Sequence, residues 1–423
     1  MLRLTNQAKE VFKLYPDEIQ EMLSDLFTST LNFLDLDNIV SILLIGSGSR
    51  GELSYTPGSE LDIFSDVEFV IVVKKMISKE DIIELDKIYR NLEDLWKIRS
   101  PLFYIDYGIS TELKFKYTPP TLWAYEAKTL GVVVYGEDVK QYLPDVDCNT
   151  LDFGNLNELV IVRLWNMLIH INNDFVDGMS SKYENFVIQF YYARNILDIL
   201  TILLPNHGVL KGGYKNRSQY FINGFNSDRW NHFKSGISDA TDFKLNMINN
   251  STLREFQCLF LEGFVNLVFD ISNINNANGF DDLIKSKEVI IQKNIFRERW
   301  LRFLRRKVVE FQLFSQYYKF NPSSLILFTS DKIRINLLYM LFYLHKFMQI
   351  NLPENEKKLH LESAIRHFNV FAKVVFIYND KHPTSKNFKE LRSKLLDFMM
   401  IWFYSRSGKE KSVIMNYIQW RDK

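Results

Sequence analysis

The sequence predicts an α+β fold, in which an N-terminal α/β region with a mixed sheet precedes a large all-helical region. Strand-like and helix-like patterns alternate between residues 39 and 135. Beyond about residue 156 the strand patterns nearly vanish, and apolar residues recur at helical spacing. With 423 residues, 47% of them hydrophobic, the chain is long enough to bury more than one core. We expect domains at 1–145, 146–275 and 276–423.

The N-terminal region begins with residues 1–33, whose spacing predicts a pair of amphipathic helices and no signal peptide. The apolar run Ile42–Ile45 then precedes Gly46–Gly51, a stretch of glycine, serine and arginine. An apolar run before glycines predicts a buried strand that enters a tight turn, with a helix start after it. A turn of this kind exposes backbone N–H groups that can bind phosphate.

Two carboxylates mark the start of the next predicted strand. Asp66 and Glu68 alternate with apolar residues, so their side chains project from the same face. Carboxylates this close repel each other unless a cation lies between them. A pair of divalent ions held by such ligands stabilises the attacking and leaving oxygens of an in-line displacement. The stretch therefore predicts a metal-dependent phosphoryl-transfer site.

These residues resemble the DNA polymerase beta-like nucleotidyltransferase superfamily, in which a strand, a Gly-Ser turn and a helix precede a strand with Asp-x-Asp or Asp-x-Glu. Within that superfamily, Gly46–Glu52 and Ser65–Phe69 are most similar to the lincosamide nucleotidyltransferases and less similar to the aminoglycoside adenylyltransferases. The resemblance covers about the first 145 residues. It implies a nucleoside triphosphate (NTP) substrate and magnesium.

The same resemblance implies that Asp66 and Glu68 ligate Mg²⁺ in a two-metal site. The segment between the glycine turn and this strand is a little longer than is usual in the family. Asp62, which also precedes the strand, is therefore a competing ligand.

The glycine turn is the expected nucleotide site. The resemblance implies that Gly46 and Ser47 hold the triphosphate, and we add Ser49 and Arg50 from the same turn. An arginine can bind phosphate through charge-assisted hydrogen bonds, or it can pair with a carboxylate of the protein. The carboxylates near enough in sequence to pair with Arg50 are Glu52 and Glu60.

A third carboxylate is expected after a helix-like segment at residues 79–99. Tyr107-Gly108 is typical of a turn, and a strand is predicted at Thr111–Tyr117, where apolar residues alternate with lysines. This segment is similar to the family's strand whose glutamate takes the proton of the acceptor hydroxyl. We therefore expect Glu112 to act as general base or third ligand, with Asp106 as the alternative.

The helical region contains a glycine-rich loop at Lys211–Arg217. Lys211 and Lys215 in this loop are candidates to close over a triphosphate or a base, although a solvated surface loop would have the same composition. Arg194 lies in an otherwise apolar helix and therefore requires an anionic or carbonyl partner. Asp198, four residues later, is the nearest candidate on the same helix.

The one dense basic cluster lies in a long helix predicted at Glu288–Phe314. It suggests contact with RNA or another acidic partner, and a solvated helix face is the alternative. The net charge of +1, from 52 basic and 51 acidic residues, provides no overall field that would attract nucleic acid or membrane. The arginines that would contact RNA are Arg297, Arg302, Arg305 and Arg306.

Other features exclude several kinds of protein. Cys148 and Cys258 are far apart, which argues against a disulfide framework or a structural zinc site. The sequence has no P-loop and no nucleophile elbow of an α/β hydrolase. The longest apolar stretches, Phe186–Leu204 and Leu337–Ile350, carry charges and so predict buried helices rather than membrane spans. We expect a cytoplasmic protein.

Together these features predict magnesium-dependent transfer of a nucleoside monophosphate from an NTP to a hydroxyl group of a small, antibiotic-like acceptor, with release of pyrophosphate. Antibiotic resistance would be the biological role. A toxin or defence enzyme that modifies tRNA or a protein is a second hypothesis. A nucleotide-binding sensor without catalytic activity is a third.

Overall fold

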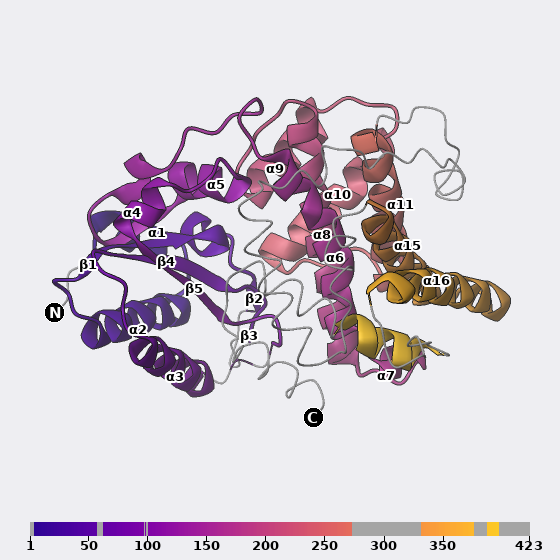
Figure 1. Cartoon of the computed structure of the whole chain (residues 1–423), viewed down its shortest axis with the longest axis horizontal. Coiled ribbons are helices and arrows are strands. Elements are labelled where there is room, and N and C mark those ends of the chain that lie inside the picture. Colours follow the sequence, from indigo (N-terminus) through magenta and orange to yellow (C-terminus); the bar gives the residue numbers. More distant parts are fainter. Residues whose placement is uncertain are drawn as a thin grey trace. The chain divides into compact units, whose positions relative to one another are not determined.

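A computed structural model describes residues 4–56, 62–96, 98, 100–272, 331–375 and 387–396. Its described part contains a mixed four-stranded sheet near the N-terminus followed by helices, which confirms the predicted α+β fold (Figure 1). The chain divides into two compact units, 1–152 with 204–250 and 153–203 with 251–423. The division into three domains at 145 and 275 stays a prediction.

The first unit is built on a sheet with the strand order β5-β4-β1-β6. Strand β1 is antiparallel to both β4 and β6, whereas β4 and β5 are parallel, so the sheet is mixed as expected. All seven residues of β1 are buried, as the apolar run predicts for a central strand. The strands are β1 (Ile39–Ile45), β4 (Val67–Val73), β5 (Ile105–Thr111) and β6 (Val132–Gly136).

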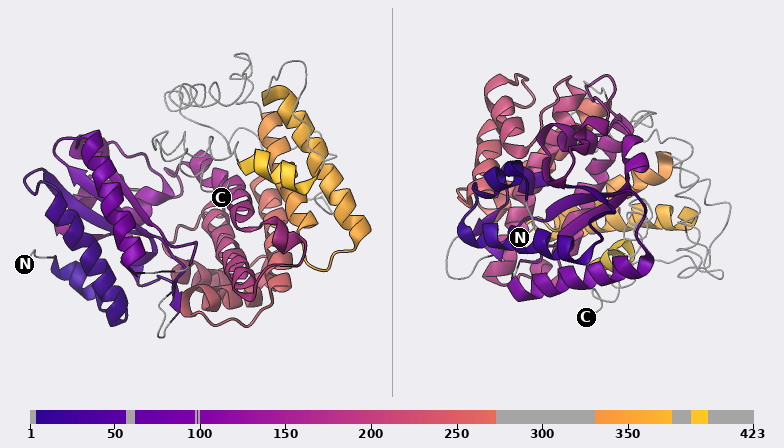
Figure 2. Two further views of the ribbon diagram at one scale, coloured as in Figure 1. Left: turned by 90° about the horizontal axis from the view of Figure 1, so that it is seen from below. Right: turned by 90° about the vertical axis from the view of Figure 1, so that its left-hand side faces the viewer.

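One face of the sheet is covered by helices α1 (Asn6–Phe12), α2 (Asp17–Phe33) and α3 (Lys79–Trp96), and α2 and α3 lie side by side along it (Figures 1 and 2). Alternate strand residues such as Phe69 pack into this core, where Phe27 meets the Phe69 ring edge-on at 5.3 Å. The helices expected within residues 1–33 and 79–99 are therefore confirmed.

The opposite face packs against α4 (Glu112–Lys116), α5 (Leu122–Leu130) and the short helix η2 (Val139–Tyr142). On this face β4 presents Val70 and Val72. Successive side chains of a strand point to opposite faces, and Glu68 is two residues before Val70. Its side chain therefore lies on the same face as these two valines.

The strand predicted at Thr111–Tyr117 is wrong. The Thr111 hydroxyl accepts a hydrogen bond from the Lys114 N–H and caps helix α4, so β5 ends at Thr111 and a helix follows. The turn predicted at Tyr107-Gly108 is also wrong, because both residues lie within β5. Alternation of apolar residues with lysines over so short a segment does not separate a strand from one helical turn.

The glycine-rich stretch forms a short 3₁₀ helix, η1 (Gly46–Arg50), so the expected turn and helix start are one tight element. A two-stranded hairpin, β2 (Tyr55–Thr56) with β3 (Asp62–Ile63), then leads to β4. The described residues between η1 and β4 therefore contain a hairpin in place of the intervening helix of the family pattern.

The first unit is completed by residues far away in the sequence. They form α9 (Tyr214–Gly224), η3 (Asn231–Phe233) and α10 (Lys234–Asn246). These helices bring the loop at Lys211–Arg217 into the same unit as the sheet.

The second unit is helical in its described part, and α15 and α16 pack against each other (Figure 2). In this unit Arg163 pairs with Asp198 at 2.8 Å, whereas the Arg194 guanidinium lies 5.8 Å from the centre of the Tyr191 ring. The helices are α6 (Phe153–His170), α7 (Asn173–Val176), α8 (Lys182–Asn206), α11 (Leu253–Ser272), α15 (Asp331–Phe347) and α16 (Glu354–Val375).

Within the described ranges, α8 is the one helix that is long and apolar enough to cross a membrane. Its apolar window is 94% buried inside the protein. The stretch at Phe186–Leu204 therefore forms a buried helix, as expected from its charged residues.

Candidate functional site

The glycine turn and Glu68 are in contact. Ile45, the last residue of β1, lies opposite Glu68 in the antiparallel register. Gly46 then takes a left-handed conformation with φ +65°. A Cβ atom added to Gly46 would lie 2.0 Å from Oε2 of Glu68. The Glu68 carboxylate therefore rests on the backbone of the turn, in a place from which a Cβ atom would displace it.

A buried tyrosine forms hydrogen bonds to the backbone of the turn. The Tyr15 hydroxyl donates to the carbonyl oxygens of Ser47 at 3.1 Å and Gly48 at 3.0 Å. The Ser49 hydroxyl donates to the Gly46 carbonyl at 3.0 Å. Burial raises the pKa of Tyr15, so the hydroxyl keeps the proton that it donates. The sequence-predicted residues Ser47 and Ser49 thus belong to one fixed, buried turn.

A further carboxylate lies next to Glu68. In the parallel pairing of β4 with β5, Glu68 is opposite Asp106. Tyr107 and Ile109 pack into the core on the first face of the sheet, so Asp106 projects from the second face together with Glu68. Asp66 precedes Glu68 by two residues and is buried. The structure therefore brings Asp66, Glu68 and Asp106 to one corner of the sheet, beside the glycine turn.

Glu112 is not brought to this corner. It follows the far end of β5, roughly 16 Å along the strand from Asp106. Its carboxylate pairs with Lys116 at 2.7 Å on the exposed surface of α4. The position of Asp106 is therefore the better one for a third carboxylate.

Asp62, the competing metal ligand, has a structural partner. Its side chain is fully buried, and Oδ1 accepts the Ser100 N–H at 2.7 Å. This bond ties the β2–β3 hairpin to the segment before β5.

The carboxylates fit magnesium if the nucleotide completes the site. Within the described residues, no group of three or more His, Cys, Asp and Glu side chains is placed to hold a metal ion by itself. Mg²⁺ prefers oxygen ligands and is usually bound through one or two carboxylates, with water and substrate phosphates in the other positions. Asp66 and Glu68 beside the glycine turn match that requirement.

Arg50 pairs with Glu52, one of the two carboxylates expected from the sequence, and also with Glu126; Glu60 lies outside the described residues. The Arg50 Nε lies 2.7 Å from Glu52, and Nη1 lies 3.5 Å from Glu126 of α5. Arg217 of α9 reaches the other Glu126 oxygen at 2.8 Å. All four side chains are largely buried, with exposed fractions of 5% to 19%. The sequence analysis did not identify Glu126, although a glutamate in an apolar helix indicates a buried partner.

The same two glutamates hold the N-terminus of α9. The Gly213 N–H donates to Glu126 at 3.0 Å, and the Tyr214 and Lys215 N–H groups donate to Glu52 at 3.2 and 3.0 Å. Carboxylates are stabilised there by the unpaired N–H groups and by the helix dipole. Burial acts to raise the pKa of Glu126, but Arg217, Arg50 and the Gly213 N–H together lower it.

A buried lysine links α10 to the start of β4. Nζ of Lys244 lies 2.5 Å from the Ser54 hydroxyl, 3.0 Å from the Ser65 hydroxyl and 3.4 Å from the Glu52 carbonyl. Ser65 immediately precedes Asp66, so this lysine fixes the chain on both sides of the hairpin. The sequence analysis missed Lys244, because its partners are about 180 to 190 residues away.

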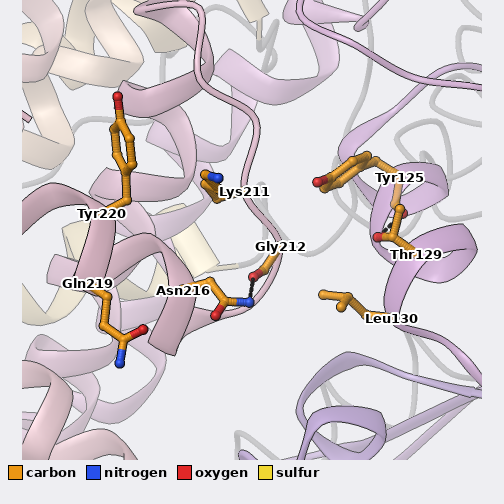
Figure 3. Close-up of a pocket in the computed structure, with 8 residues that line it drawn as sticks. All are labelled: Tyr125, Thr129, Leu130, Lys211, Gly212, Asn216, Gln219 and Tyr220. Carbon is orange, nitrogen blue, oxygen red and sulfur yellow. Dashed lines mark hydrogen bonds between the residues drawn. The ribbon is translucent and has the colours of Figure 1, made fainter. Parts of the chain in front are cut away.

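The remaining sequence-predicted residues lie in different places. Lys215 is exposed at the first turn of α9. Lys211 lines a pocket of about 430 Å³ between α5 and α9 (Figure 3). The basic cluster with Arg297, Arg302, Arg305 and Arg306 lies outside the described residues.

Alanine at Gly46 is expected to weaken binding of magnesium NTP at least about tenfold. The Cβ would displace the Glu68 carboxylate, and an alanine at positive φ costs about 1–2 kcal/mol in addition. Isothermal titration calorimetry measures the affinity. Gly208→Ala is the matched control, because Gly208 has φ +77° but nothing within 4 Å of its added Cβ. Equal affinity in the two variants would contradict the contact between Glu68 and the turn.

Comparisons with known proteins add one distant similarity. No family model matches the sequence, and no curated protein matches it. Among solved structures, the chain is similar to the spectinomycin adenyltransferase AAD(9) from Enterococcus faecialis, solved with ATP and spectinomycin. The TM-score is 0.34 with 14% sequence identity, and the alignment covers 57% of this chain and 96% of that chain. The function proposed for this chain rests on the geometry of its own site.

Proposed function

We propose that the protein transfers a nucleoside monophosphate from an NTP to a hydroxyl group of a small acceptor, with magnesium, and releases pyrophosphate. The observation that carries this proposal is the contact of the Glu68 carboxylate with the Gly46 turn, beside Asp66 and Asp106. This arrangement joins a tight glycine turn to a set of oxygen ligands. Neither part alone is specific, since glycine turns and acidic strand ends are common.

Each residue has a distinct part in the proposed reaction. Gly46 and Ser47 hold the triphosphate at the turn. The Tyr15 hydroxyl fixes the backbone of this turn by its hydrogen bond to the Ser47 carbonyl. Asp66 and Glu68 would hold Mg²⁺, which when bound neutralises phosphate charge and favours departure of pyrophosphate. Asp106 accepts the proton of the acceptor hydroxyl. The hydroxyl oxygen then attacks the α-phosphate, and the bond from the α-phosphate to pyrophosphate breaks.

Replacing Asp106 with Asn is expected to lower kcat by about 100-fold or more, because an amide cannot accept the proton of the attacking hydroxyl. Glu112→Gln, the matched change on α4, should stay within about twofold of wild type, since that carboxylate is exposed and paired with Lys116. Steady-state kinetics of both variants decides between the two carboxylates. The reverse ranking would restore Glu112 as the base.

The proposed acceptor is a small, hydroxyl-bearing, antibiotic-like molecule. The test is transfer of label from an NTP labelled at the α-phosphate to pools of lincosamides, aminoglycosides and total tRNA. Label in an antibiotic pool supports the proposal and names the acceptor class. Label in tRNA alone would replace the small acceptor by an RNA end. Magnesium NTP binding without transfer to any pool would indicate a sensor and would overturn the proposed reaction.

A further inference from the structure

The pocket between α5 and α9 has a lining that differs from the acidic corner of the sheet. Two tyrosines, Tyr125 on α5 and Tyr220 on α9, face it from opposite sides, and Lys211 lies between them (Figure 3). Nζ of Lys211 is 5.7 Å from the centre of the Tyr220 ring. The other lining residues are Thr129, Leu130, Gly212, Asn216 and Gln219.

The lining has one cation and, among its eight residues, no carboxylate. A cationic aminoglycoside would therefore meet Lys211 and no acidic partner. A planar base can stack on a tyrosine ring, and amide side chains such as those of Asn216 and Gln219 can bond to base edges. A phosphate adds the negative charge that a lysine binds. The volume of about 430 Å³ lies within the range of small-molecule pockets.

Several contacts fix the shape of the pocket. The Tyr125 hydroxyl donates to the Leu210 carbonyl at 3.4 Å, and the Asn216 amide donates to the Gly212 carbonyl at 3.1 Å. A Cβ added to Gly212 would lie 2.4 Å from a Leu130 methyl carbon, so glycine allows the loop to approach α5 closely. These contacts position Tyr125, Asn216 and the loop at Gly212.

The pocket and the glycine turn lie on different sides of the loop. Gly212 faces Leu130 and Tyr125, whereas its neighbour Gly213 faces Glu52 and Arg50. The buried ion pairs of Arg50 therefore stand between the pocket and the turn against which the Glu68 carboxylate rests.

We propose that this pocket binds a nucleotide unit, base against tyrosine and phosphate against Lys211, at a site separate from the Gly46 turn. Binding here requires no metal ion, because no lining residue is a carboxylate ligand. The site goes beyond the proposed transfer reaction, which uses the triphosphate at the glycine turn.

The experiment is calorimetric titration of the full chain with AMP, GMP, CMP and UMP in the presence of EDTA. We expect at least one nucleotide to bind wild type. Tyr220→Ala should weaken that binding at least about tenfold, since stacking contributes about 1–3 kcal/mol per base, and Tyr220→Phe should retain it. Tyr117→Ala is the matched control, because Tyr117 is 79% exposed just after the end of α4. Thermal melting verifies that each variant is folded.

The lysine is tested separately. The matching nucleoside, which has no phosphate, should bind wild type more weakly than the nucleotide, and Lys211→Met should remove that difference. The proposal is overturned if no nucleotide binds in EDTA, or if Tyr220→Ala behaves like Tyr117→Ala. Loss of EDTA-resistant binding in Asp66→Ala would also overturn it, by placing the nucleotide at the turn. Failure of the transfer reaction alone leaves these results unaffected, so the two proposals fail separately.

Discussion

Replacing Asp66 with Asn, or Glu68 with Gln, is expected to lower kcat for nucleotidyl transfer by about 1,000-fold or more. Both changes keep the size of the side chain and remove the charge that would hold Mg²⁺ against the triphosphate. The metal contributes several kcal/mol of transition-state stabilisation, and each 1.36 kcal/mol corresponds to tenfold in rate. Steady-state kinetics with saturating NTP measures the effect.

The control is Glu84→Gln on α3, where the carboxylate is 51% exposed and pairs with Lys87 on the surface. That variant should keep wild-type kcat, and all three proteins should melt at similar temperatures. Unchanged turnover in Asp66→Asn or Glu68→Gln would show that the carboxylates beside the glycine turn are not the catalytic ligands.

Replacing Arg217 with Met is expected to lower the free energy of unfolding by about 3 kcal/mol. The change leaves the buried Glu126 carboxylate without its 2.8 Å partner, and removal of one member of a buried pair costs about 3–5 kcal/mol. Urea denaturation gives the value. Lys116→Met breaks an exposed pair with Glu112 and should cost less than about 1 kcal/mol.

The double variant Arg217→Met/Glu126→Gln should recover part of the loss, because it removes the unpaired charge.

The lowered pKa of Glu126 adds a pH dependence to the stability of the protein. When the pKa of a carboxyl group is lower in the folded than in the unfolded protein, the group stabilises the folded state at pH values above its unfolded-state pKa. This stabilisation is lost as the pH falls through the folded-state pKa. Wild type should therefore lose stability below about pH 4.5, and Arg217→Met should lose less over that range. Equal slopes in the two proteins would contradict this role of the pair.

The parts of the site that are local in sequence could be predicted. The apolar run before Gly46 gave strand β1, and the period of two in β4 placed Glu68 on one face. Both follow from residues that are neighbours along the chain.

The third carboxylate depended on strand pairing. Asp106 lies beside Glu68 only because β5 is parallel to β4 in one register, and nothing in either segment alone specifies that register. Glu112 is the residue that the sequence resemblance indicates, because Thr111–Tyr117 alternates like the family's strand that carries the proton-accepting glutamate. The Thr111 cap, which starts a helix there, was the signal that could have corrected it.

The buried polar network could not be predicted, because it joins residues far apart in the chain. Glu52 and Glu126 meet the N-terminus of α9 at sequence separations of 87 to 163 residues. Lys244 reaches Ser54 across 190 residues. The sequence around each side chain does not indicate its partner. The contacts form only when the fold places α9 and α10 beside the turn.

The most direct measurement is pyrophosphate release from each of the four nucleoside triphosphates with Mg²⁺, for wild type and Asp66→Ala, with pooled aminoglycosides, lincosamides and total tRNA as acceptors. A site built from the Gly46 turn, Asp66 and Glu68 predicts release by wild type with one acceptor pool, and loss of that release with Asp66→Ala or EDTA. Release that continues at the wild-type rate in folded Asp66→Ala, or no release by wild type with any pool, would contradict nucleotidyl transfer at this site.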